Sequence, residues 1–119
     1  MSERAVLRIG DIKDNIAAIR ELLKGRSVAE LEKDRFARAA LERFLEIVSE
    51  ASRRLPDAWK AEHSEISWRR MADVGNIIRH AYDAVDLPTL WRICQDDLDP
   101  LEAAIDAMIA AHSPKDPSS

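Results

Sequence analysis

Residues 9–25 read Ile-Gly-Asp-Ile-Lys-Asp-Asn-Ile-Ala-Ala-Ile-Arg-Glu-Leu-Leu-Lys-Gly, and this stretch already indicates the class of the fold. Isoleucine or leucine recurs at intervals of three and four residues, which places these side chains on one stripe of an α-helix. The stripe comprises Ile9, Ile12, Ile16, Ile19 and Leu23. Gly25 stands where a C-terminal cap belongs. We therefore predict a helix from about residue 3 to residue 24.

The next segment continues the helical pattern after a short break. Ser27 is followed three residues later by Glu30, a capping box that predicts an extra helical turn between the first and second long helices. The second long helix is expected from about residue 33 to residue 54, and Pro56 ends it because proline cannot continue a helix. Its expected inner stripe comprises Ala37, Leu41, Phe44, Val48, Ala51 and Leu55.

Two further helices are predicted in the second half of the chain. Ser67 and Asp86 are the expected N-caps of these helices, and Pro100 is expected to kink the last one. The link from residue 56 to residue 67 contains Trp59, His63 and Ile66, and is apolar enough to pack over the end of a bundle. No stretch alternates apolar and polar residues with period two. The predicted fold is all-α, an antiparallel four-helix bundle.

Composition indicates one soluble, cytoplasmic domain. The chain has 119 residues, 46% of them hydrophobic and 34% charged, with no run of eighteen apolar residues that could span a membrane. We expect the domain to cover residues 1–112, and residues 113–119 to form a disordered tail. One cysteine, Cys94, and three scattered histidines offer almost nothing to a metal, so no metal site is expected.

Charge limits how the chain could bind nucleic acid. The formal net charge is −4, whereas binding by bulk electrostatics normally depends on many cationic contacts with phosphates. A local patch remains open, because Arg69, Arg70 and Arg79 supply positive charge around the segment that holds His80. The alternative is that these arginines only form a solvated helix face.

Residues 75–82, Gly-Asn-Ile-Ile-Arg-His-Ala-Tyr, hold the candidate functional side chains. Asn76 lies one helical turn before His80 and could bond one ring nitrogen, which would leave the other free for proton transfer. Arg79 could stabilise a developing negative charge. Adjacent helical residues point about 100° apart, so Arg79 would serve the His80 site only at a frayed helix end or across a dimer interface. The alternative for His80 is a structural histidine.

Residues 4–110 resemble the HepT-like ribonuclease toxins of the HEPN superfamily, which are four-helix-bundle proteins of bacteria and archaea. The resemblance is carried by several short segments together rather than by any one of them. These are Ile9-Gly10-Asp11-Ile12, Glu50-Ala51, Ile66-Ser67-Trp68-Arg69, Asn76 through His80 to Tyr82, and Val85-Asp86-Leu87 leading to Trp91.

The family motif is an arginine, four to six residues, then a histidine, commonly with a polar residue after the arginine and a tyrosine two past the histidine. Asn76, His80 and Tyr82 match the last three positions, whereas Gly75 stands in place of the arginine. The resemblance implies a metal-independent endoribonuclease with a composite site at a homodimer interface, and it implies that no cofactor is needed. His80 would be general acid or base, and Asn76 would orient it or the phosphate. Arg79, in a different register, would replace the missing arginine, and Arg69 or Arg70 would bind RNA.

The resemblance also implies a partner. Such toxins are typically encoded beside a minimal nucleotidyltransferase antitoxin, in a type VII-like pair, and the antitoxin can add AMP to the motif tyrosine. Tyr82 would be the acceptor here, unless it only packs at the helix end. Two other hypotheses stay open: a non-catalytic module that partners a nucleotidyltransferase, with Gly75 marking the loss of nuclease chemistry, and a helical scaffold that dimerises through an apolar seam.

Overall fold

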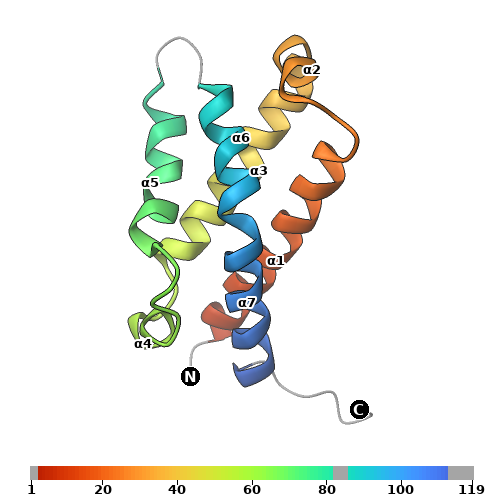
Figure 1. Ribbon diagram of the computed structural model, residues 1–119. Helices are drawn as coiled ribbons and strands as arrows, with labels where there is room; N and C mark the ends of the chain where they lie inside the picture. Colours follow the sequence, from red (N-terminus) through yellow and green to blue (C-terminus); the bar gives the residue numbers. More distant parts are fainter. Residues whose placement is uncertain (1–2, 82–85, 113–119) are drawn as a thin grey trace.

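The computed structural model describes residues 3–81 and 86–112, and within these ranges every regular element is an α-helix. The chain direction alternates between successive long helices, and α6 and α7 continue one another to form the fourth arm (Figure 1). The prediction of an all-α helical bundle is confirmed. The helices are α1 (Glu3–Leu23), α2 (Val28–Lys33), α3 (Arg35–Arg53), α4 (Asp57–Ala61), α5 (Trp68–Arg79), α6 (Leu87–Asp96) and α7 (Leu98–His112).

The helix ends follow from local chemistry. Gly25 has a φ of 72°, the left-handed conformation that terminates a helix. The predicted capping box is present: the Ser27 hydroxyl accepts from the Glu30 amide, and the Glu30 carboxylate accepts from the Ser27 amide, both at 3.2 Å. The Ser67 hydroxyl accepts from the Arg70 amide at 3.3 Å and so starts α5. These three boundaries were predicted correctly from sequence.

The core lies where α3 packs between α1 and α5, and where α7 closes against α1. The four isoleucines of the predicted α1 stripe are completely buried. On α3 the prediction needs one correction, because Leu45 is fully buried while Phe44 is only partly covered. Side chains three or four residues apart lie on the same face of a helix. From Leu41 the buried stripe continues to Leu45, four residues on, and not to Phe44, three residues on.

The predicted effect of Pro100 on the last helix is present, and it takes the form of a one-residue interruption at Asp97 between α6 and α7. α6 ends at Asp96, and the Asp97 amide donates to the Ile93 carbonyl at 2.8 Å. Pro100 falls in the first turn of α7. Proline has no amide hydrogen and clashes with the carbonyl four residues back, which is that of Asp96. The helix therefore breaks before Pro100, and the proline sits in a first turn, where its missing amide costs nothing.

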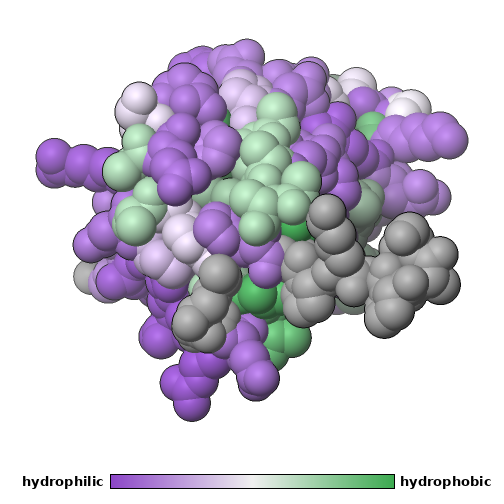
Figure 2. Space-filling model, turned by 90° about the horizontal axis from the view of Figure 1, so that it is seen from below, coloured by the Kyte–Doolittle hydropathy of each residue, from purple (hydrophilic) through white to green (hydrophobic). Residues whose placement is uncertain are grey.

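The link after α3 closes one end of the bundle, as predicted. Trp59 and Ile66 are buried there, and the Trp59 ring stacks on His112 with centroids 3.9 Å apart. The Trp68 indole donates to the carbonyls of Lys60 and His63 at 3.1 and 3.0 Å. Seen from this end, mostly hydrophilic residues surround smaller hydrophobic areas (Figure 2). Among the described residues, no helix combines the length and the hydropathy needed to cross a membrane.

Candidate functional site

The C-terminal end of α5 carries the candidate site. Arg79 is the last residue of the helix and His80 is its C-cap, with φ −102° and ψ 12°. The His80 amide donates to the Asn76 carbonyl at 3.0 Å, which completes the final turn. Asn76, Arg79 and His80 are all exposed. Arg79 and His80 therefore lie at the end of α5, in a last turn that is hydrogen-bonded.

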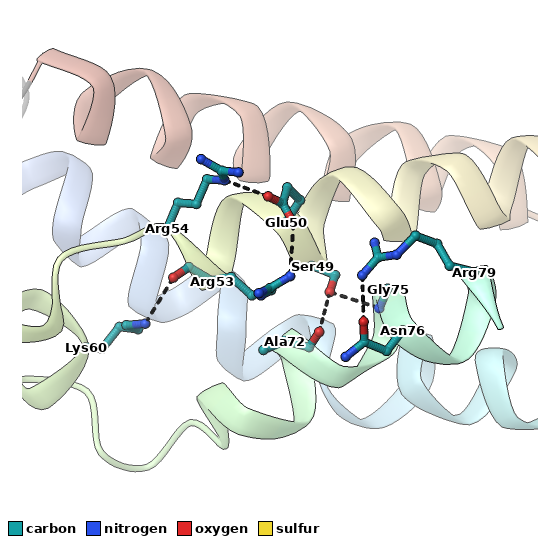
Figure 3. A network of polar contacts seen from close by, with 9 residues as sticks. All are labelled: Ser49, Glu50, Arg53, Arg54, Lys60, Ala72, Gly75, Asn76 and Arg79. Carbon is teal, nitrogen blue, oxygen red and sulfur yellow. Dashed lines mark hydrogen bonds and ion pairs between the residues drawn. The ribbon is translucent and has the colours of Figure 1, made fainter.

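Arg79 is held by Asn76. One guanidinium nitrogen of Arg79 donates to the Asn76 side-chain oxygen at 2.6 Å (Figure 3). We expected Asn76 to bond the His80 ring, but no such bond occurs among the described residues, and the amide oxygen lies on Arg79 instead. Asn76 thus fixes the cationic side chain rather than the imidazole.

Gly75 lies directly beneath that guanidinium. A Cβ atom at position 75 would stand 3.0 Å from Nη1 of Arg79 and 3.0 Å from the Ser49 hydroxyl. The side chain of Arg79 therefore folds back one helical turn and covers the position where the family motif has its arginine. Arg79 comes four residues after the motif position in the sequence, but its guanidinium reaches back to residue 75.

The buried Ser49 explains why residue 75 is a glycine. Ser49 was not identified from the sequence. Its hydroxyl accepts from the Gly75 amide at 2.9 Å and donates to the Ala72 carbonyl at 3.0 Å, so α3 and α5 approach closely (Figure 3). The side chain is 1% exposed. A glycine in the middle of a helix was the available signal, since it costs about 1 kcal/mol relative to alanine and indicates a packing requirement.

The exposed side of α3 adds more charge beside Arg79. The Glu50 carboxylate accepts from Nε of Arg54 at 2.6 Å and lies 3.5 Å from Nη1 of Arg53 (Figure 3). The hydrogen bond from Arg54 lowers the pKa of Glu50 below its usual value, and the positive charges of Arg54, Arg53 and Arg79 act in the same direction. Glu50 is therefore an ion-paired carboxylate and not a candidate general acid.

Arg69 and Arg70 are not brought to this site. They lie at the start of α5, about 15 Å along the helix axis from its C-terminal end at 1.5 Å per residue. Nε of Arg70 lies 3.1 Å from the Asp97 carboxylate on the fourth arm. Burial raises the pKa of Asp97 despite this positive charge. Arg69 and Arg70, which were predicted to bind RNA, therefore do not lie beside His80 within one protomer.

Other candidate groups contribute less. Tyr82 lies outside the described residues. Cys94 is buried, and burial raises its pKa to about 12, so it is a poor nucleophile at neutral pH. In residues 3–81 and 86–112, no three histidine, cysteine, aspartate or glutamate side chains converge as metal ligands.

Comparison with known proteins gives consistent matches. A family model described as "Ribonuclease HepT-like" matches residues 12–108. A Thermococcus cleftensis protein named "Probable ribonuclease HepT" is 33% identical over 98 residues, which cover 82% of this chain and 89% of that protein. A Methanocaldococcus jannaschii protein named "Putative RNase MJ1380" is 28% identical over 107 residues, covering 89% and 98%. No solved structure matches the chain.

Proposed function

The chain belongs to the HepT-like ribonuclease family, and on that basis we propose that it is a metal-independent endoribonuclease whose site includes His80, Asn76 and Arg79. The family membership confirms the resemblance drawn from sequence. The activity would serve the toxin of a cytoplasmic toxin–antitoxin pair. Because Gly75 departs from the family motif, the proposal rests on the residues of this chain and not on the motif alone.

The observation that carries the proposal is the position of Arg79. Its guanidinium is fixed by Asn76 at 2.6 Å and lies over Gly75, one residue from the exposed His80. A planar guanidinium suits a phosphate because it can donate two parallel hydrogen bonds. An exposed imidazole can supply the base, and a fixed cation beside it can stabilise the developing charge, which are two of the groups that RNA cleavage by acid–base catalysis uses.

The chemistry can be written with this chain's groups. Neutral His80 would take the proton from a ribose 2′-hydroxyl, and the resulting oxygen would attack the adjacent phosphorus. The bond from phosphorus to the 5′ oxygen of the next nucleotide then breaks, leaving a 2′,3′-cyclic phosphate. Arg79 would stabilise the extra negative charge on the phosphoryl oxygens, as donors aimed at developing charge do. The departing 5′ oxygen must receive a proton from a second acid.

A homodimer would supply that second acid. The attacking 2′ oxygen and the departing 5′ oxygen lie on opposite sides of the phosphorus. The single His80 at the end of α5 in one protomer cannot contact both oxygens at once. A two-fold interface that brings the two α5 ends together would place two copies of His80 and Arg79 in one cleft. The base would then come from one protomer and the acid from the other.

We further propose that a minimal nucleotidyltransferase is the partner and that Tyr82 accepts AMP from it. Tyr82 is two residues past His80 and is the only tyrosine in the chain. Transfer would join the tyrosine oxygen to the α-phosphorus of ATP, releasing pyrophosphate. The added phosphate would bring negative charge against an incoming RNA phosphate. Loss of activity together with a mass gain of one AMP on the peptide containing Tyr82 tests this directly.

Gly75 also favours a second candidate, a non-catalytic module of the same family that dimerises and binds the nucleotidyltransferase. In that case the Asn76–Arg79 pair would only close the end of α5, and no RNA cleavage would occur. The two candidates predict opposite results for the purified protein.

The experiment that separates them is cleavage of total RNA in a chelator by wild-type protein and by His80→Ala, Arg79→Ala and Arg92→Ala. We expect losses of about 10²–10⁴-fold for His80→Ala and 10²–10³-fold for Arg79→Ala. Arg92 is exposed on α6 and should not matter. An excess of His80→Ala protein mixed with wild type should inhibit it by forming heterodimers. No cleavage by clean, dimeric wild-type protein would exclude the nuclease and favour the binding module.

A further inference from the structure

A charged groove of about 290 Å³ runs along the exposed side of α3, between α1 and the end of α5. Its residues on α3 and at the C-cap of that helix recur at helical intervals from Arg43 to Arg54, which is eleven steps of 1.5 Å, or about 17 Å. Arg79 lines the groove from α5, so the groove reaches the candidate site. It is lined by Arg8, Asp11, Arg43, Glu46, Ile47, Glu50, Ala51, Arg54 and Arg79.

The arginines of this groove differ in how they are paired. Arg54 is neutralised by Glu50 at 2.6 Å. Within residues 3–81 and 86–112, Arg8, Arg43 and Arg79 have no ion pair with a carboxylate: Arg8 donates to the Arg54 carbonyl at 3.2 Å, and Arg79 donates to Asn76. Three guanidinium groups are therefore available to an anion without breaking an internal ion pair. The groove is lined by four arginines and three carboxylates, so its local charge is positive although the whole chain is acidic. At 0.15 M salt the screening length is about 8 Å, so charges farther away contribute little.

We propose that single-stranded RNA enters the site along this groove, with its phosphates on Arg8, Arg43 and Arg79. This inference rests on the proposed function and adds a path for the substrate. None of the residues that line the groove is aromatic, so bases have no ring to stack on, and the proposed contacts are with the RNA backbone rather than with its sequence.

A second groove on the other side of α5 is the competing path. It measures about 340 Å³ and contains Arg69, Arg70 and Arg92, together with the apolar side chains of Val74, Ile77 and Ile93. Arg70 is committed to Asp97 at 3.1 Å, and the groove does not include Arg79. Among the described residues it therefore offers two arginines without an ion pair, Arg69 and Arg92, rather than three, and it has no direct route to the guanidinium over Gly75.

The test measures binding of a fluorescent single-stranded oligouridine by anisotropy across a salt series. The protein carries His80→Ala, so that RNA is not cleaved. Arg43→Gln should weaken binding roughly two- to fivefold, the range for an exposed charge contact, and reduce the slope of log affinity against log salt by about 0.7. Glu46→Gln, which removes a carboxylate from the same groove, should strengthen binding.

Matched controls separate position from net charge. Arg92→Gln removes one positive charge, as Arg43→Gln does, but from the second groove. Glu42→Gln removes one negative charge, as Glu46→Gln does, but from a position on α3 that does not line the groove. Both should leave affinity nearly unchanged. The inference is overturned if Arg92→Gln weakens binding more than Arg43→Gln, if no RNA binds, or if Arg43→Gln instead dissociates a dimer in sedimentation, which would assign the groove to a protein interface.

The outcomes also separate this inference from the proposed function. Cleavage by wild-type protein with no effect of Arg43→Gln on binding would retain the nuclease and reject the groove. Opposite shifts for Arg43→Gln and Glu46→Gln without any cleavage would retain the groove and reject the nuclease.

Discussion

Replacing Gly75 with alanine tests the packing that positions Arg79. The new Cβ would lie 3.0 Å from the Arg79 guanidinium, 3.0 Å from the Ser49 hydroxyl and 3.4 Å from the Ser49 Cβ. Arg79 is exposed and can move away. Ser49 is buried and holds two hydrogen bonds to the backbone of α5, so it cannot move without weakening them.

The magnitude follows from opposing terms. Overpacking a tight contact costs about 1–3 kcal/mol, and the strain on the two Ser49 hydrogen bonds is part of that cost. Alanine recovers about 1 kcal/mol of helix propensity relative to glycine. We therefore expect Gly75→Ala to lower the free energy of unfolding by about 1 kcal/mol. Displacement of Arg79 should also reduce RNA cleavage in a protein that remains folded.

Gly10→Ala is the matched control. Gly10 lies within α1, and a Cβ there would meet nothing within 4 Å. This variant should gain about 1 kcal/mol from helix propensity alone. The two variants should then differ by about 2 kcal/mol, or roughly 8 °C in Tm for a domain of this size. Thermal unfolding by circular dichroism measures the difference, and equal stabilisation by both substitutions would refute the close contact.

Two further predictions concern titratable groups. The lowered pKa of Glu50 stabilises the fold above the carboxyl's unfolded value of 4.5, and this contribution is lost as pH falls through the folded pKa. Glu50→Gln should therefore cost up to about 1 kcal/mol at pH 7, the limit for an exposed pair, with no cost remaining at the acid end of a urea-unfolding series. A cost independent of pH would contradict this reading. Cys94, with a pKa of about 12, should resist alkylation by iodoacetamide at pH 8 until urea unfolds the chain; rapid labelling of the native protein would show that the thiol is accessible.

Much of the fold could be predicted from sequence because helix signals are local. The isoleucine stripe of α1, the Ser27–Glu30 capping box and the Ser67 N-cap depend on residues within one or two turns, and all are present. The error on α3 occurred where two local choices competed, because the stripe could pass through Phe44 or Leu45. At Pro100 the sequence predicted a disturbed helix, but not that the disturbance is a one-residue break at Asp97.

The candidate site could be predicted only in part because its contacts join different helices. The segment from Asn76 to His80 was found from the motif, but its bonding pattern was not. The Ser49 contact with Gly75 spans 26 residues, and no periodicity along one helix indicates it. The Asn76–Arg79 bond is local, yet sequence alone could not decide whether Asn76 holds the arginine or the histidine.

The most direct test of the central claim is the chemistry of cleavage itself. A defined single-stranded RNA is incubated with wild-type protein in a chelator, beside the same oligonucleotide with 2′-deoxyribose throughout, and the new ends are identified by mass spectrometry. We predict cleavage of the RNA alone, with a 2′,3′-cyclic phosphate at each new 3′ end and no product from His80→Ala. Cleavage of the deoxy strand, a strict requirement for added metal, or no cleavage by dimeric wild-type protein would contradict a ribonuclease that uses His80 and Arg79.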